Sequence, residues 1–357
     1  MKVMLEDDCR FRPTIENYIT IASFCIIFCL SVVGNAVVII VILQQRSMRS
    51  VTNIYLLNLA ITDLMLSLVC MPPTLISSVI YCWIFGDLLC KLFAYLQPVV
   101  VTASAYTLAL IAFERYYAIC KPLHSRIWHT RSHAYVMITL VWVISVLANL
   151  LMLFMFEQQT YNVNGLTCAP RHQPILHFYY QIYMTSVLLL IPLCIMVLLY
   201  GSVIHSLRNG MKMDYVSSAI YNSKSLIVLL HNSAKNERSF MAKQRMIKML
   251  IVIVIIFFCC WTPNYMWWLL LTAQDSFKTF DIWNSQVNTA ITVLCYISSC
   301  ANPITYCFLN KKFRAALLVT FGSKRKNPNQ FRTLYMPEMP MTDTPTHTHN
   351  IENQVLY

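Results

Sequence analysis

Charge and glycine are both scarce in this chain of 357 residues. Only 12% of the residues are charged, the chain has 6 glycines, and 57% of the residues are apolar. Soluble globular domains carry about a quarter charged residues, so the low charge argues against a soluble enzyme or binding module. The composition indicates that lipid is the solvent for most of the chain.

Repeats, selectivity-filter motifs and catalytic clusters are also missing from the sequence. A transporter is expected to show inverted repeats and broken helices, and a channel needs a filter. The histidines of one polar connection, His124, His129 and His133, are expected to be solvated rather than ligands of a metal ion. The sequence therefore favours neither a transporter, nor a channel, nor an enzyme.

Long uncharged stretches divide the chain into seven parts. They cover residues 17–45, 64–86, 92–113, 134–156, 172–207, 249–274 and 282–310. Each can supply the roughly 20 apolar residues that cross a bilayer as a helix. Because backbone groups in hydrocarbon must pair within their own segment, the stretches cannot be open strands, and a β-barrel is excluded. The sequence predicts an all-α membrane protein, a bundle of seven transmembrane helices.

The distribution of basic residues predicts the orientation in the membrane. Six of the 27 Lys and Arg would lie on the side of the N-terminus: Lys2, Arg10, Arg12, Lys91, Arg171 and Lys278. The other 21 face the opposite side, which predicts an extracellular N-terminus and a cytoplasmic C-terminus in the plasma membrane. The net charge of +12 then reflects contact with anionic membrane lipids, and no nucleic-acid binding is expected.

Four segments are expected along the chain. They are an extracellular N-terminus at 1–16, the seven-helix domain at 17–310, an amphipathic helix at 311–321 and a disordered cytoplasmic tail at 322–357. The first segment lacks the basic region and cleavage site of a signal peptide, so the first span is expected to direct insertion. Phe313, Leu317 and Phe321 recur every fourth residue, which is typical of a helix lying on the membrane surface. The connection at 206–242 is expected to be disordered or partly helical.

Among the polar residues in or directly beside the predicted spans, three stand out: Asp63, Asn35 and Asn302. Asp63 would cost at least about 2.5–3.5 kcal/mol if it faced lipid, so it must face the bundle and needs partners. Asn35 and Asn302, in the first and seventh spans, are the natural candidates. Polar residues of this kind can also serve only to fasten helices together, and that alternative stays open for each of them.

The sequence contexts of these residues resemble the motifs of rhodopsin-like G-protein-coupled receptors. The matching stretches are Gly34-Asn35-Ala36-Val37-Val38, Leu59-Ala60-Ile61-Thr62-Asp63, Glu114-Arg115-Tyr116, Trp142, Pro192 with Tyr200, Cys260-Trp261-Thr262-Pro263 and Asn302-Pro303-Ile304-Thr305-Tyr306. The resemblance covers about residues 17–321. Any one motif is a weak signal, but seven in matching places on seven spans are specific.

The resemblance implies a conformational switch and a heterotrimeric G protein as partner. The implied switch residues are Glu114, Arg115, Tyr200, Trp261, Pro263, Asn302, Pro303 and Tyr306. Arg115 would pair with Glu114 at rest and turn to the G protein when active. Leu123, Lys243 and Arg245 are the further expected G-protein contacts. No acid lies near Lys243 and Arg245, so an ion pair from Arg115 to the sixth span is not expected.

The resemblance further implies an ion site, a disulfide and sites of modification. Asp63, Ser104, Ser299 and Asn302 resemble a sodium pocket, and this allosteric sodium ion is the one candidate metal or cofactor. Cys90 and Cys168 resemble the family disulfide, while Cys9 and Cys82 are left as a second pairing. The alternating Thr342, Thr344, Thr346 and Thr348 are expected to be phosphorylated by receptor kinases and to recruit arrestin.

The sequence also bears on the type of ligand. Gln97 stands where amine receptors carry an Asp, and Tyr296 stands where opsins carry a retinal-binding Lys, so neither ligand is expected. The stretches 121–134, 245–254 and 298–303 are similar to cholecystokinin, gastrin and sulfakinin receptors. At ligand-facing positions this similarity ends, since the Asn and two Arg of those receptors are replaced by Trp268, Leu271 and Ala169.

A short peptide with an amidated C-terminus is the ligand that the sequence favours. It would enter end-first among Gln97, Trp268, Leu271, Asn288, Thr292 and Tyr296. The aromatic residues Tyr265, Trp267, Trp268 and Trp283 suit an apolar peptide terminus, or else they anchor the chain in the membrane interface. The expected function is a cholecystokinin-like or sulfakinin-like receptor that activates Gq and calcium signalling. The alternatives are a receptor for another amidated peptide of the orexin, neuropeptide FF or RFamide kind, and a non-signalling seven-helix scaffold.

Overall fold

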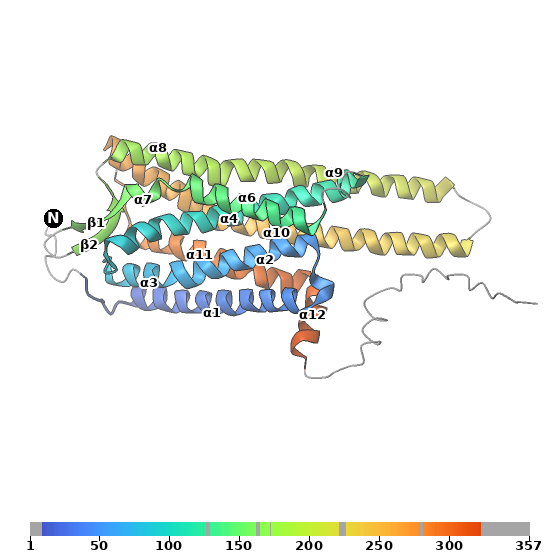
Figure 1. Cartoon of the computed structure of the whole chain (residues 1–357), viewed down its shortest axis with the longest axis horizontal. Helices are drawn as coiled ribbons and strands as arrows, with labels where there is room; N and C mark the ends of the chain where they lie inside the picture. Colours follow the sequence, from blue (N-terminus) through green and yellow to red (C-terminus); the bar gives the residue numbers. More distant parts are fainter. Residues whose placement is uncertain are drawn as a thin grey trace, which may run out of the picture. The chain divides into compact units, whose positions relative to one another are not determined.

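Seven helices long and apolar enough to cross a membrane dominate the computed structural model of the protein. It describes residues 9–123, 125, 129–161, 165–171, 173–220, 226–278 and 281–322, with the backbone alone at 210–220 and 226–239. The chain forms two compact units, one at 1–320 and another at 321–357. Figure 1 shows the long helices of the first unit running side by side. The predicted all-α seven-helix bundle is confirmed.

In the described part of the chain, the seven spans consist of twelve helical segments in chain order. They are α1 (Ile15–Gln44); α2 (Val51–Met65), η2 (Leu66–Cys70) and α3 (Met71–Ile80); α4 (Gly86–Cys120); α6 (Arg131–Ala148) with α7 (Met152–Met155); α8 (Pro174–Thr185), η3 (Ser186–Leu190) and α9 (Ile191–Ile220); α10 (Leu226–Phe277); and α11 (Ser285–Leu309). The segments η2 and η3 are π-helical turns within the second and fifth spans. A short 3-10 turn, η1 (Arg46–Met48), follows α1, and α12 (Lys311–Phe321) follows α11.

Several helices extend well beyond the uncharged stretches that predicted them. The second span begins at Val51 rather than at residue 64, and α4 runs from Gly86 to Cys120 rather than over 92–113. A side-chain cap begins α2, because the Ser50 hydroxyl accepts a hydrogen bond from the backbone N–H of Asn53. An uncharged stretch therefore marks the part of a helix within lipid and not its ends.

The connection after the fourth span forms a β-hairpin, which the sequence did not predict. Strand β1 (Phe156–Tyr161) pairs antiparallel with β2 (Gly165–Pro170), and a disulfide joins Cys168 of β2 to Cys90 of α4. Figure 1 shows β1 and β2 at one end of the helices, which we call the hairpin end. The opposite end, where α4 finishes just beyond Arg115, is called the Arg115 end.

A second disulfide joins Cys9 to Cys82 at the hairpin end. The backbone N–H of the next residue, Trp83, donates to the carbonyl of Leu166 in β2 over 2.8 Å. The connection between α3 and α4 is thus held both to the start of the described chain and to the hairpin. The four predicted phosphorylation sites, Thr342, Thr344, Thr346 and Thr348, lie outside the described residues.

Candidate functional site

A cavity of about 490 Å³ opens at the hairpin end, between α3, α4, α8, α10, α11 and the hairpin. Five of the six predicted ligand-binding residues line it: Gln97, Trp268, Asn288, Thr292 and Tyr296. Leu271 was predicted wrongly as a sixth, because its side chain is 6% exposed and lies outside the cavity wall. Of the four predicted aromatic wall residues, Tyr265, Trp268 and Trp283 line the cavity, whereas Trp267 does not.

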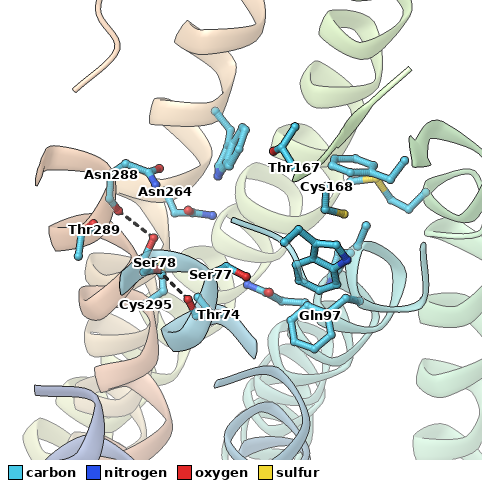
Figure 2. A pocket seen from close by; sticks show the side chains of 18 of the residues that line it. Thr74, Ser77, Ser78, Gln97, Thr167, Cys168, Asn264, Asn288, Thr289 and Cys295 are labelled. Atoms are coloured by element: carbon cyan, nitrogen blue, oxygen red, sulfur yellow. Dashed lines mark hydrogen bonds between the residues drawn. The ribbon is translucent and has the colours of Figure 1, made fainter. Parts of the chain in front are cut away.

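Carboxamide groups supply much of the polar character of the cavity. Neither Gln97 of α4 nor Asn264 of α10 has a side-chain hydrogen bond within the described part of the chain, so both amides are available to a ligand. Asn288 uses its oxygen to accept from Trp267 Nε1 at 3.1 Å, which leaves its amide hydrogens available. Figure 2 shows Asn264 beside Asn288, with Gln97 and Ser77 pointing toward one another.

No charged side chain lines the cavity among the residues that the structure describes. Its lining contains no Asp, Glu, Lys or Arg. At its rim, Asp87 pairs with Lys91 at 2.5 Å and Glu157 pairs with Arg171 at 2.8 Å. The interior is therefore a neutral, hydrogen-bonding environment with aromatic walls, of the kind that binds small organic groups.

Hydrogen bonds fix the floor of the cavity. Trp261 Nε1 donates to the Ser298 hydroxyl at 3.1 Å, which ties α10 to α11. The hydroxyls of Tyr296 and Thr74 lie 2.9 Å apart and tie α11 to α3. A ligand that reaches the floor would contact Trp261 and Tyr296, which connect it to the helices beneath.

Asp63 lies buried below the floor, where Asn302 donates to its carboxylate at 2.7 Å. Asn302 was correctly expected as its partner. Ser104, expected in the same pocket, donates instead to Thr62 at 2.8 Å. The hydroxyl of Ser299 is buried and has no hydrogen-bond partner among the described residues. The site thus presents oxygen ligands, and none of the described hydrogen bonds or ion pairs brings a basic side chain to Asp63.

Asn35, the other expected partner of Asp63, forms no hydrogen bond with it among the described residues. Its side-chain amide donates to the carbonyl of Ser299 at 2.9 Å and to that of Ser31 at 2.9 Å. The cause is Pro303, which has no N–H and so leaves the carbonyl of Ser299, four residues earlier, without its helical partner. Asn35 supplies the missing donor and joins α1 to α11.

The Arg115 end holds a polar cluster around the Glu114-Arg115 pair. Arg115, 7% exposed, forms an ion pair with Glu114 and donates to Thr52 at 2.6 Å. Across to α10 its guanidinium contacts the sulfur of Met246 at 3.4 Å, a neutral contact in place of an acid. His129 also approaches Glu114, with 2.8 Å between Nδ1 and Oε1. The arrangement holds Arg115 inside the bundle.

The other predicted switch and G-protein residues lie around this cluster or along the bundle axis. Tyr200 of α9 and Tyr306 of α11 are buried, and both hydroxyls lack a hydrogen-bond partner in the described chain. Pro263 lies within α10, as expected for a bend. Leu123 is highly exposed, and Lys243 and Arg245 are exposed on α10, so all three are accessible to a partner.

Among the polar residues of the cavity wall that were not predicted from the sequence are Asn264, His177 and Gln181. Asn264 follows Pro263 directly, in a motif noted only for its bend. His177 and Gln181 stand four residues apart at the start of an apolar span, on one helix face. A polar pair at this spacing in an apolar helix was a signal that could have identified them.

Comparison with known proteins agrees with this architecture. Residues 34–306 match the family described as 7 transmembrane receptor (rhodopsin family). The chain belongs to this family: it is a rhodopsin-like G-protein-coupled receptor. The receptor is accordingly a multi-pass protein of the plasma membrane and not an enzyme.

Similar proteins include several cholecystokinin receptors. The cholecystokinin receptor type A of Cavia porcellus is 34% identical, over 87% of this chain and 83% of its own. The cholecystokinin receptor of Xenopus laevis is 33% identical, over 90% and 82%. The gastrin/cholecystokinin type B receptor of Mus musculus is 31% identical, over 94% and 86%.

Proposed function

We propose that this receptor binds a short peptide through an amidated C-terminus and activates a heterotrimeric G protein of the Gq class, which raises cytoplasmic calcium. The observation that carries the proposal is the neutral cavity, in which the carboxamides of Gln97 and Asn264 have no hydrogen-bond partner within the described chain. The likeness to cholecystokinin and gastrin receptors supports a peptide as the ligand.

A carboxamide terminus matches these side chains better than a free carboxylate does. The amide group both donates and accepts hydrogen bonds, as Gln97 and Asn264 do. A carboxylate would bring a charge into a cavity that lacks any Lys or Arg in its described lining, and burying an uncompensated charge is costly. The peptide would therefore enter with its amidated end toward the floor formed by Trp261 and Tyr296.

The same argument disfavours a sulfated peptide. Ala169 occupies the hairpin position at which the resembling receptors carry an Arg for sulfotyrosine, and it lies opposite Glu157 in the hairpin. Arg171, the nearest basic residue in the hairpin sequence, is already paired with Glu157. These residues favour an unsulfated amidated peptide over a sulfated cholecystokinin-like ligand. A peptide of the orexin, neuropeptide FF or RFamide kind is therefore the second candidate ligand.

Acidic residues near the cavity mouth would attract a basic peptide. The extracellular segments of the sequence hold eight of them: Glu6, Asp7, Asp8, Glu16, Asp87, Glu157, Asp275 and Asp281. The first three lie outside the described residues, and Asp87 and Glu157 are paired with basic residues. Glu16, Asp275 and Asp281 form no ion pair with a described residue, so steering of a basic peptide rests on them.

A sodium ion is proposed to regulate the same receptor. The carboxylate of Asp63 and the hydroxyl of Ser299 fit such an ion, since both are buried oxygens and no basic side chain of the described residues pairs with either. Asn302 would complete the site. A bound cation would supply the positive charge that offsets the buried Asp63.

The decisive experiment compares one agonist in three forms. Cells expressing the receptor are screened with amidated neuropeptides, with calcium and cyclic AMP as readouts. The most potent agonist is then made as amide, free acid and tyrosine-sulfated amide. We expect the amide to be roughly 10- to 100-fold more potent than the acid, and sulfation to give no gain. Equal potency of acid and amide would remove the argument from Gln97 and Asn264, and a large gain on sulfation would favour the sulfakinin-like alternative.

A further inference from the structure

Two buried polar side chains on the fifth span remain unused by the account so far. His177 and Gln181 lie one turn apart on α8, and each is only 6% exposed. Both line the cavity, and neither side chain forms a hydrogen bond with the part of the chain that the structure describes. Buried polar groups normally have partners, so a pair that faces a cavity without them points to a ligand.

The surroundings of this pair are fixed and largely apolar. The ring of Phe156, from the hairpin, packs edge-to-face on the imidazole of His177 with 5.9 Å between centroids. Met184, the next residue of α8 along the cavity wall, is buried. The start of α8 is held to α10 by a hydrogen bond of 2.9 Å from the Ser276 hydroxyl to the carbonyl of Pro174. The two polar groups therefore stand on a rigid wall of defined shape.

The wall also differs from the one assigned to the peptide terminus. Gln97 and Asn264 project from α4 and α10, whereas His177 and Gln181 project from α8. A single terminal amide offers one carbonyl oxygen and one NH₂, which the first pair of carboxamides can already satisfy. The pair on α8 is left for a different part of the same ligand.

We propose that His177 and Gln181 form a second ligand subsite, which takes a neutral side chain of the peptide that both donates and accepts hydrogen bonds, namely a carboxamide or a hydroxyl. The inference rests on the proposed function, because it assumes a peptide in the cavity. An imidazole and a carboxamide together present donors and acceptors, which such a side chain complements.

Charged side chains fit this subsite poorly. The described lining of the cavity holds no Lys or Arg to pair with a carboxylate or sulfate, and no Asp or Glu to pair with an ammonium or guanidinium. Asp275, which acts on His177 electrostatically, is exposed and lies outside the described lining of the cavity. An apolar side chain would leave both polar groups of the wall without partners, which is the basis of the selectivity.

The test uses a positional library of short peptides in which each position carries Asn, Gln, Ser, Tyr, Leu, Phe, Asp or Lys, and each peptide is made as amide and as free acid. The full-length receptor, His177→Phe and Gln181→Leu are expressed in cells, and calcium responses are scaled to surface biotinylation. Tyr179→Phe is the matched control, because it also removes a polar group from α8 but at an exposed position. Gln181→Met repeats the test in case Gln181→Leu fails to reach the surface.

In the wild type, one peptide position should prefer Asn, Gln, Ser or Tyr over Leu and Phe by about 5- to 100-fold in potency. His177→Phe and Gln181→Leu should abolish most of this preference while the amide-over-acid ratio persists, and Tyr179→Phe should change neither. A side-chain preference that survives both substitutions would overturn the subsite and leave the proposed function standing. Equal potency of amide and free-acid peptides on the wild type would instead overturn the proposed binding of an amidated terminus. Absence of any response to the library would overturn both the proposed function and the subsite.

Discussion

Replacing Gly34 by Ala tests the joint between α1 and α11 that supports the switch. A Cβ atom at residue 34 would lie 2.9 Å from Cβ and 3.0 Å from Cγ of Pro303. The proline ring is rigid and part of α11, so the two helices would have to separate. Asn35, the next residue, would then lose its good approach to the carbonyl of Ser299.

Two opposing effects decide the size of the change. Overpacking by one methyl group costs about 1–3 kcal/mol. Alanine in place of glycine inside a helix gains about 0.5–1 kcal/mol from backbone entropy. Gly201→Ala is the matched control, because a Cβ there would meet nothing within 4 Å and only the gain remains. The difference between the two variants should therefore be about 1–3 kcal/mol.

The assay is thermal unfolding of the purified receptor in one detergent. Unfolding is monitored through the reactivity of the buried cysteines, which react with a thiol reagent once they become exposed. Gly34→Ala should unfold roughly 2–12 °C below Gly201→Ala, from about 2–4 °C per kcal/mol. If both variants unfold at the same temperature, α1 and α11 are not in the tight contact described, and the account of the Asn35 hydrogen bond fails with it.

Three further predictions concern the switch, the ion site and the tail. Arg115→Ala should reduce G-protein activation to background at equal surface expression with ligand binding retained, whereas unchanged signalling would show that Arg115 is not the switch. Raising the sodium concentration should weaken agonist binding to the wild type by about 5- to 150-fold at saturation and leave Asp63→Asn unaffected, as measured by radioligand competition. Equal sensitivity of the two proteins would show that Asp63 only fastens helices together. Replacing all four threonines at 342–348 by alanine should slow desensitisation and arrestin recruitment in a luminescence assay, and unchanged kinetics would place the phosphorylation sites elsewhere.

Hydropathy alone was enough to predict the seven spans, because lipid forces every uncharged stretch of this length into a helix. It was not enough to predict their ends. The helix from Val51 continues through Asp63 without a break, since the carboxylate faces Asn302 rather than lipid. The β-hairpin escaped prediction because its pairing, from Phe156 to Pro170, lies outside lipid and its residues show no strict alternation.

Motif matching placed most of the site residues but only some of their partners. Asn35 was expected beside Asp63, but its amide donates instead to the carbonyl of Ser299. That carbonyl lacks its helical partner because Pro303 has no N–H. Leu271 was assigned to the cavity from a receptor position rather than from packing, and it is buried elsewhere. Asn264 was overlooked because its place in the sequence gives no sign that it faces the cavity. Only the three-dimensional arrangement shows its amide in the cavity wall, with no hydrogen-bond partner among the described residues.

The central claim is that the cavity binds a neutral amide terminus through Gln97 and Asn264. The most direct measurement is the ratio of the dissociation constants of one peptide as free acid and as amide, on the wild type and on Gln97→Leu and Asn264→Leu. The account predicts a ratio of roughly 10 to 100 for the wild type that falls toward 1 in each variant, mainly through weaker binding of the amide. An amide preference of the same size in all three proteins would contradict it, because the terminus would then bind elsewhere.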